Sequence, residues 1–214
     1  MATTKRNKGT TAKKSAGDVS AEDDLVYQAL ETELGGVEVY TAALENVQND
    51  DLREEWEEYL EQTRNHVEIA EALCEELGLD PARETPGRKI VRAIGKALVK
   101  AIQDAGRGGD AKAAEIVAAE CVTLAETKDH SNWALISKLA EKSSGERKDA
   151  LREAADQVED EEDEHLYHTS GWARELWLDA LGLDAELPPP EEEDDVKTEE
   201  EAVESKQRSM KSRG

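Results

Sequence analysis

The stretch from Val158 to Trp172 constrains the fold of this chain most, because two of its ionisable residues fall on an apolar helical stripe. Positions spaced alternately by three and four residues share one face of a helix. On this face, Glu162 and His165 stand among apolar residues that extend from Leu151 to Leu176. A carboxylate that is buried without a partner is strongly destabilising. An inward-facing Glu-x-x-His pair therefore needs a counter-charge or a metal ion from the rest of the chain.

Composition predicts an all-α protein. Charged residues make up 36% of the chain and aromatic residues 4%, and long Ala-, Glu-, Leu-, Lys- and Arg-rich tracts lack alternating β-branched runs. The net charge of -24 disfavours nucleic acid and anionic membranes over most of the surface and favours cations. No apolar run approaches the roughly 20 residues of a membrane span, and the N-terminus lacks a signal-peptide core. A cytoplasmic location is therefore expected, with Cys74 and Cys121 as reduced, buried thiols.

Two helices are predicted in the first half, from about Ser20 to Gln48 and from about Asp51 to Leu77. Each has an apolar stripe that an ionisable residue interrupts, Glu33 in the first helix and His66 in the second. Counted from the Asn49-Asp50 turn, both residues lie roughly 25 Å away along their helices. An antiparallel hairpin would therefore place Glu33 beside His66.

The second half repeats this arrangement. A helix from about Asp110 to Lys142 carries Glu126 and Asp129 on its apolar stripe, and the helix after the turn at Gly145 carries Glu162. Glu126 and Glu162 are nearly equidistant from that turn, so a second antiparallel hairpin would bring them together. The two halves look like a duplicated unit.

A helical bundle domain is predicted at residues 21–183. Three segments of the chain are not part of its two hairpins. Residues 1–20 are Lys-rich and predicted to be a disordered basic tail, which lies against the acidic body or, as the less favoured alternative, binds nucleic acid. Residues 79–110 form a crossover with a basic amphipathic helix, expected to pack on the bundle rather than on a membrane surface. Residues 184–214 are predicted to be a disordered acidic tail.

Four helices in two hairpins, a long helical crossover between the second and third, and inward Glu, His, Glu and Glu-x-x-His positions resemble the ferritin-like di-iron carboxylate superfamily. The sequences E-E-D-E-H at residues 161–165 and E-T-K-D-H-S-N-W at residues 126–133 are most similar to its small bacterial stress-protein branch, the YciF-type proteins. The resemblance covers about residues 22–180. It implies a ferritin-like four-helix bundle of two antiparallel hairpins.

The resemblance also implies a metal centre, because each half of a protein in this superfamily supplies ligands to two iron or manganese ions. Carried over to this chain, the ligands would be two terminal carboxylates, one bridging carboxylate and two imidazoles: Glu33 and Glu126, Glu162, and His66 and His165. Thr63 stands where the second bridging Glu belongs, and a neutral hydroxyl does not bridge two cations. Asp129 or Gln62 could partly substitute for that carboxylate.

The activity that the resemblance implies is iron oxidation with peroxide handling, in an oxidative or general stress response. Thr63 leaves open a weakened di-metal site, a single metal ion, or a polar network in a relative that has lost its metal. The alternative is a metal-free helical-bundle interaction or structural protein, in which six residues pair with one another: Glu33, His66, Glu126, Asp129, Glu162 and His165. Whether the protein is an enzyme, and whether it forms a homo-oligomer, stays open at this point.

Overall fold

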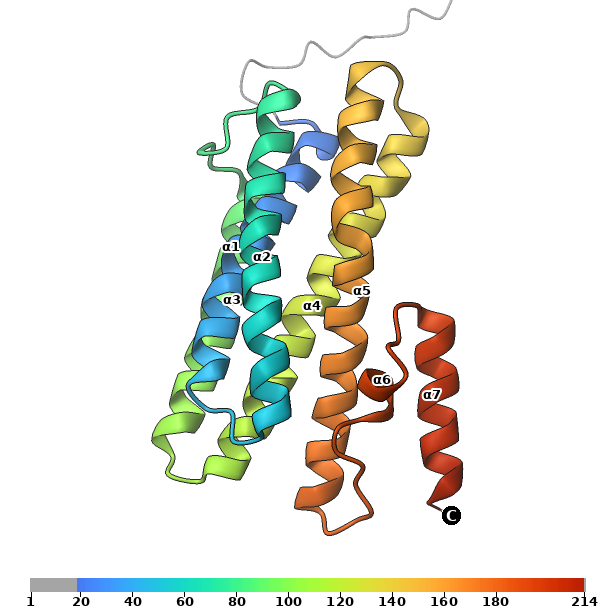
Figure 1. Ribbon diagram of the computed structural model, residues 1–214. Helices are drawn as coiled ribbons and strands as arrows, with labels where there is room; N and C mark the ends of the chain where they lie inside the picture. Colours follow the sequence, from blue (N-terminus) through green and yellow to red (C-terminus); the bar gives the residue numbers. More distant parts are fainter. Residues whose placement is uncertain (1–18, 214) are drawn as a thin grey trace, which may run out of the picture.

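The computed structural model describes residues 19–213, and within this range the chain forms seven helices and no strand (Figure 1). The helices are α1 Ala21–Leu44, α2 Asp50–Glu76, α3 Pro86–Arg107, α4 Ala111–Lys142, α5 Glu146–Ala180, α6 Pro190–Glu193 and α7 Glu199–Ser212. The predicted all-α class is confirmed. Most of the predicted basic tail, residues 1–18, lies outside the described residues. None of the described helices combines the length and the apolar composition that a membrane crossing requires.

Side-chain caps explain where helices α1 to α4 begin. The Ser20 hydroxyl accepts a hydrogen bond from a backbone N–H in the first turn of α1, and Asn49, Thr85 and Asp110 cap α2, α3 and α4 in the same way. The turn before α5 instead depends on Gly145, whose φ of 60° is a conformation that side chains disfavour. The predicted helix start near Ser20 and the predicted turn at Gly145 are both confirmed.

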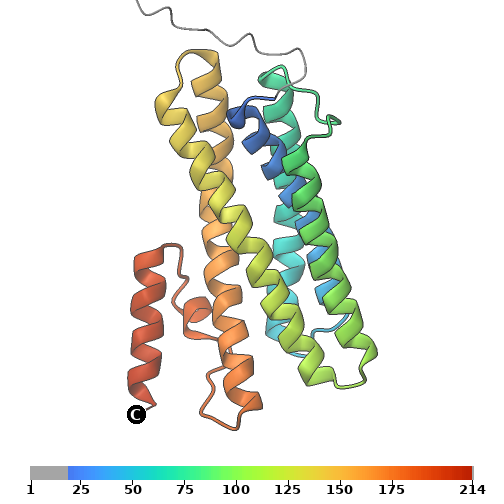
Figure 2. The ribbon, with the colours of Figure 1, turned by 180° about the vertical axis from the view of Figure 1, so that it is seen from behind.

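Two antiparallel hairpins, α1 with α2 and α4 with α5, pack side by side as a helical bundle (Figure 1). Helix α3 connects them and runs back along the bundle, so that α4 starts at the same end as α2 and runs in the same direction. Seen from behind, α3 lies against α1 and the first part of α4 (Figure 2). The crossover is therefore a fifth long helix on the outside of the bundle.

A layer of polar side chains divides the buried core into two apolar clusters. One cluster includes Trp56 and Trp172, and the other includes Trp133 and Leu151. Each of the helices α1, α2, α4 and α5 contributes to both clusters, and on each helix the candidate site residues lie between the two contributions, as Glu33 does on α1. The candidate site therefore lies at mid-height in the bundle, with apolar packing above and below it.

A buried ion-pair cluster holds α3 against α1. The Glu31 carboxylate accepts hydrogen bonds from Arg88 Nε (2.5 Å) and Arg92 Nη2 (2.8 Å), and both Glu31 and Arg88 are buried. The two helices approach closely nearby, because a Cβ added to Gly95 would lie 3.7 Å from the Cα of Gly35. The predicted packing of the basic amphipathic helix on the bundle is confirmed, and its arginines neutralise an acidic residue of α1.

The segment after α5 differs from the disordered acidic tail expected at residues 184–214. The structure places α6 and α7 there, both in contact with α5. The Arg174 guanidinium of α5 donates two hydrogen bonds to the Glu191 carboxylate (2.5 and 2.7 Å), and His168 Nε2 donates to the Val196 carbonyl oxygen (3.1 Å). Composition does not predict this packing, because charge pairs and backbone hydrogen bonds hold the segment more than apolar burial does.

The two cysteines are free and buried, as predicted. Burial raises the pKa of the Cys74 thiol to about 11 and also raises the pKa of Cys121. Both side chains are therefore neutral thiols near pH 7.

Candidate metal centre

Five of the six candidate residues meet in the middle of the bundle. They come from all four bundle helices: Glu33 from α1, His66 from α2, Glu126 from α4, and Glu162 and His165 from α5. Their exposed fractions are 0%, 0%, 3%, 1% and 0% in that order. Three carboxyl groups and two imidazoles thus share a region from which water is almost excluded.

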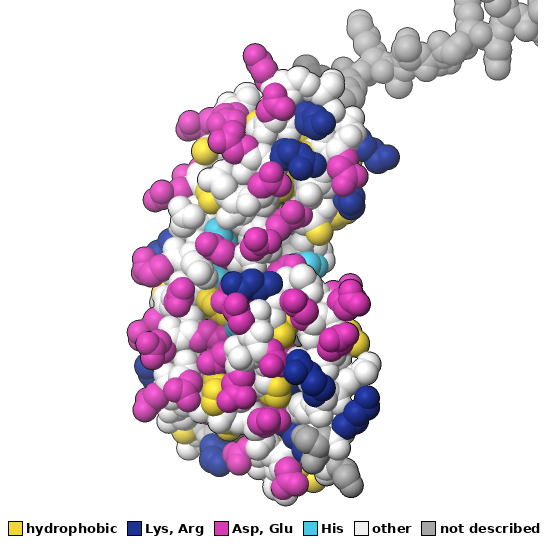
Figure 3. Space-filling model, turned by 45° about the vertical axis from the view of Figure 1, so that its right-hand side comes forward, with side chains coloured by type: hydrophobic (Ala, Val, Ile, Leu, Met, Phe, Trp, Pro, Cys, Tyr) yellow, Lys and Arg dark blue, Asp and Glu magenta, His cyan; other side chains and the backbone are white. Residues whose placement is uncertain are grey.

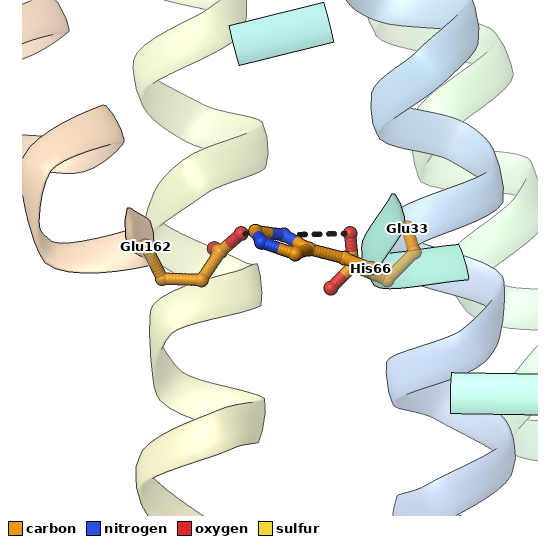
Figure 4. A group of neighbouring side chains, drawn as sticks. All are labelled: Glu33, His66 and Glu162. Atoms are coloured by element: carbon orange, nitrogen blue, oxygen red, sulfur yellow. Dashed lines mark hydrogen bonds and ion pairs between the residues drawn. The ribbon is translucent and has the colours of Figure 1, made fainter. Parts of the chain in front are cut away.

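Glu33, His66 and Glu162 form one group of potential ligands (Figure 4). His66 Nδ1 lies 3.0 Å from Glu162 Oε1 and 3.7 Å from Glu33 Oε2. Figure 4 shows the His66 imidazole between the two carboxylates, which approach it from opposite sides. One ligand atom of each residue lies within 4.8 Å of the other two, so a single cation could contact all three residues.

Glu126, Glu162 and His165 form a second group. His165 Nδ1 lies 3.7 Å from Glu126 Oε2 and 3.6 Å from Glu162 Oε1. The two imidazole rings are nearly parallel, with centroids 5.8 Å apart and an interplanar angle of 28°. Glu162 belongs to both groups and its Oε1 faces both imidazoles, so the geometry offers two cation positions that share one carboxylate.

The outer nitrogen of each imidazole is engaged by an acceptor. His66 Nε2 donates to Glu161 Oε2 (2.7 Å), and His165 Nε2 donates to Gln62 Oε1 (2.7 Å). A neutral imidazole with its proton on Nε2 has a lone pair on Nδ1. In both histidines this lone pair faces carboxylate oxygens. Metal-binding histidines adopt the same tautomer and orientation when an acceptor engages their outer nitrogen.

Burial and mutual repulsion strongly perturb the acid-base properties of the centre. Burial raises the pKa of Glu33, Asp129 and Glu162 well above the usual carboxyl value, and the neighbouring carboxylates raise it further. Burial also lowers the pKa of His66 to about 4, and His165 contributes to this shift. His66 is therefore a neutral ligand at physiological pH, while the carboxylates lack the positive charge that would stabilise their ionised form.

The carboxyls of Glu33 and Asp129 can hydrogen-bond to each other when one of them is protonated, and so can those of Glu126 and Glu162. When the carboxyls are ionised, five buried polar atoms of the centre have no hydrogen-bond partner among the described residues. They are Glu33 Oε2, Glu126 Oε2, Glu162 Oε2, Asp129 Oδ1 and His165 Nδ1. Buried polar atoms are normally satisfied, and a cluster of unsatisfied acceptors needs an explanation. A divalent cation would satisfy oxygen and nitrogen lone pairs together, so the residues present fit a metal ion.

The missing bridging carboxylate has no direct replacement. Asp129 is buried near the centre but belongs to neither group of three. Gln62 contacts the outer nitrogen of His165, away from the carboxylates. The Thr63 hydroxyl donates to the backbone oxygen of Tyr59 within its own helix (2.8 Å) and is thus directed elsewhere.

Several residues around the centre were not predicted as part of it. Trp133 Nε1 donates to Glu33 Oε1 (2.6 Å), and the Tyr59 ring lies against His165 with centroids 4.2 Å apart. The Tyr40 hydroxyl is buried beside Glu126, and burial together with Glu126 raises the pKa of Tyr40 well above the usual value. Trp133, Tyr59 and Tyr40 lie on apolar stripes, where an aromatic residue is indistinguishable from ordinary core in the sequence.

We expect cation affinity to increase with pH above the usual carboxyl range, because cations must displace protons from carboxyl groups with raised pKa values. At pH values below the raised pKa, the binding constant should increase about tenfold per pH unit for each proton that the cation displaces. His66 does not compete in this range, since its pKa is about 4. Calorimetric Mn²⁺ titrations in two buffers of different ionisation enthalpy would count the released protons. A pH-independent affinity without proton release would contradict the expectation.

The structure thus establishes a helical protein with two buried Glu/His groups that could bind metal ions. No protein-family model, curated protein or solved structure matches this chain. The case for a metal centre therefore depends on the geometry and electrostatics of the residues described above.

Proposed function

We propose that this chain is a ferritin-like metal-binding protein whose core holds two divalent cations, iron or manganese, with Glu162 shared between them. One observation carries the proposal: two groups of three buried residues meet at Glu162, and four of their carboxylate and imidazole atoms have no hydrogen-bond partner among the described residues. Two hairpins joined by a full-length crossover support a ferritin-like topology.

In this proposal the two cation positions have different ligands. Glu33 and His66 would hold one ion, Glu126 and His165 would hold the other, and Glu162 belongs to both groups. Asp129 does not complete either group, and burial raises its pKa well above the usual carboxyl value. Because Thr63 supplies no second shared carboxylate, fewer protein ligands would hold the two ions than the superfamily pattern provides.

Iron bound at this centre would supply the chemistry of oxidation by oxygen or peroxide, which suits a role in oxidative or general stress. The surrounding residues keep the ligands oriented and the site dry. Trp133 fixes one oxygen of Glu33, Glu161 and Gln62 fix the tautomers of the histidines, and Tyr59 covers the His165 ring.

Metal content after anaerobic equilibration tests the proposal. We expect protein dialysed against Fe²⁺ or Mn²⁺ to retain two ions per chain by elemental analysis, one for each group of ligands. A double variant, Glu162→Ala with His165→Ala, should retain none while its circular dichroism stays helical. Wild-type protein that retains no stoichiometric metal would favour the metal-free bundle instead.

A further inference from the structure

A cavity of about 240 Å³ opens between α4 and α5, beside the buried centre. Its walls include His130 and Trp133 from α4 and Glu159, Asp160, Glu162 and Asp163 from α5. Glu162 is the residue that both groups of ligands share. The cavity therefore lies between acidic residues of α5 and one residue of the centre, Glu162.

The outer part of this cavity is strongly acidic. Glu159, Asp160 and Asp163, here called the acidic vestibule, line it within a single turn and a half of α5. Burial raises the pKa of Glu159, and the charges of Asp163 and Asp160 add to the shift. His130 Nδ1 lies 2.7 Å from Asp163 Oδ1, and both side chains are partly exposed. Acidic side chains also predominate over basic ones on the face shown in Figure 3.

The inner end of the cavity carries a separate indication of a ligand. Glu162 is 1% exposed, and its Oε2 has no hydrogen-bond partner among the described residues. Trp133 forms an adjacent wall, and its indole N–H is already donated to Glu33 Oε1. The cavity therefore borders a residue whose buried carboxylate oxygen has no hydrogen-bond partner among the described residues.

We propose that the acidic vestibule is the loading site for divalent cations, which it captures from solvent and passes to Glu162. This inference rests on the proposed metal-binding function and adds a route to it. Charged clefts with low-dielectric walls concentrate ions of opposite charge and raise association rates by about 10- to 1000-fold. The vestibule should therefore control how fast cations bind more than how tightly they are held.

The test is stopped-flow binding of Co²⁺, followed by its visible absorbance, to a triple variant with Glu159→Gln, Asp160→Asn and Asp163→Asn. We expect its association rate constant to fall by about tenfold at low salt, with unchanged stoichiometry. A matched control removes three exposed charges from α2, with Glu54→Gln, Glu57→Gln and Glu75→Gln. The control should bind Co²⁺ at close to the wild-type rate. At high salt the difference between the two variants should shrink, because screening weakens long-range attraction.

Equal association rates in the two triple variants would overturn the loading route while leaving the metal-binding function intact. A lower stoichiometry with an unchanged rate in the vestibule variant would overturn it as well, because those carboxylates would then be ligands. If the wild-type protein bound no Co²⁺, Fe²⁺ or Mn²⁺, both the proposed function and the loading route would fail together. The two failures are therefore distinguishable.

Discussion

Replacing Glu162 with Gln is expected to abolish tight binding of both cations and, at the same time, to stabilise the metal-free protein. Glu162 is the one residue in both groups of ligands, so its loss should weaken both positions by more than about 100-fold, since even outer-shell partners contribute about 10- to 100-fold. The stability change has the opposite sign because the buried carboxylate faces Nδ1 lone pairs, whereas an amide can donate to them. A gain of about 1 to 3 kcal/mol in the free energy of unfolding is expected for the metal-free form.

Mn²⁺ titration and urea denaturation of the metal-free proteins measure these two effects. Glu153→Gln is the matched control, because Glu153 lies on the same helix but is exposed, and it should change neither quantity. Unchanged Mn²⁺ binding in Glu162→Gln would remove Glu162 as the shared ligand. A large loss of stability in the metal-free variant would instead show that Glu162 is paired within the protein, as in a metal-free bundle.

Saturation with Mn²⁺ or, without oxygen, Fe²⁺ at both positions is expected to raise the melting temperature by about 16 to 32 °C. Ions that bind only the folded state stabilise it by about 4 kcal/mol per site at a thousandfold excess over the dissociation constant. For a chain of this size each kcal/mol raises the melting temperature by about 2 to 4 °C. The increase should be large because the ions neutralise carboxylates that destabilise the metal-free core.

Thermal denaturation followed by circular dichroism, with and without a chelator, measures this increase. Mg²⁺ at the same concentration is a useful control, because it prefers oxygen ligands and water and should stabilise much less at a centre with two imidazoles. The Glu162→Gln variant should show little increase with any of these ions. Equal stabilisation by Mg²⁺ and Mn²⁺ in the wild type would indicate binding to the acidic surface rather than to the centre.

Much of this architecture could be predicted from the sequence, because the relevant signals are local and periodic. Apolar positions at helical spacing define the long helices, and Ser20 and Gly145 mark boundaries through their own chemistry. The inward positions of Glu33 and Glu162 follow from the same spacing, since polar residues on an apolar stripe are conspicuous. Equal distances from a turn then predict which residues meet across a hairpin.

Contacts between elements far apart in the chain could not be predicted in this way. Glu31 lies off the apolar stripe of α1 yet is buried, because α3 covers that side and pairs Arg88 with it. Glu161 belongs to an acidic run, and only the position of His66 makes it a hydrogen-bond partner. The helical spacing of Asp129 correctly predicts that this residue is buried. It does not predict that Asp129 lies outside both ligand groups. Burial depends on periodicity, whereas pairing depends on side-chain geometry across helices.

Electron paramagnetic resonance of the protein loaded with Mn²⁺ tests the central claim most directly, because it reports whether two ions lie close together. Two groups that share Glu162 would hold the ions near enough for their spins to interact. We predict that, as the second ion binds, the six-line spectrum of isolated Mn²⁺ gives way to a broadened spectrum of interacting ions. An isolated six-line spectrum at full occupancy, or a spectrum of free Mn²⁺ alone, would contradict a centre built around Glu162.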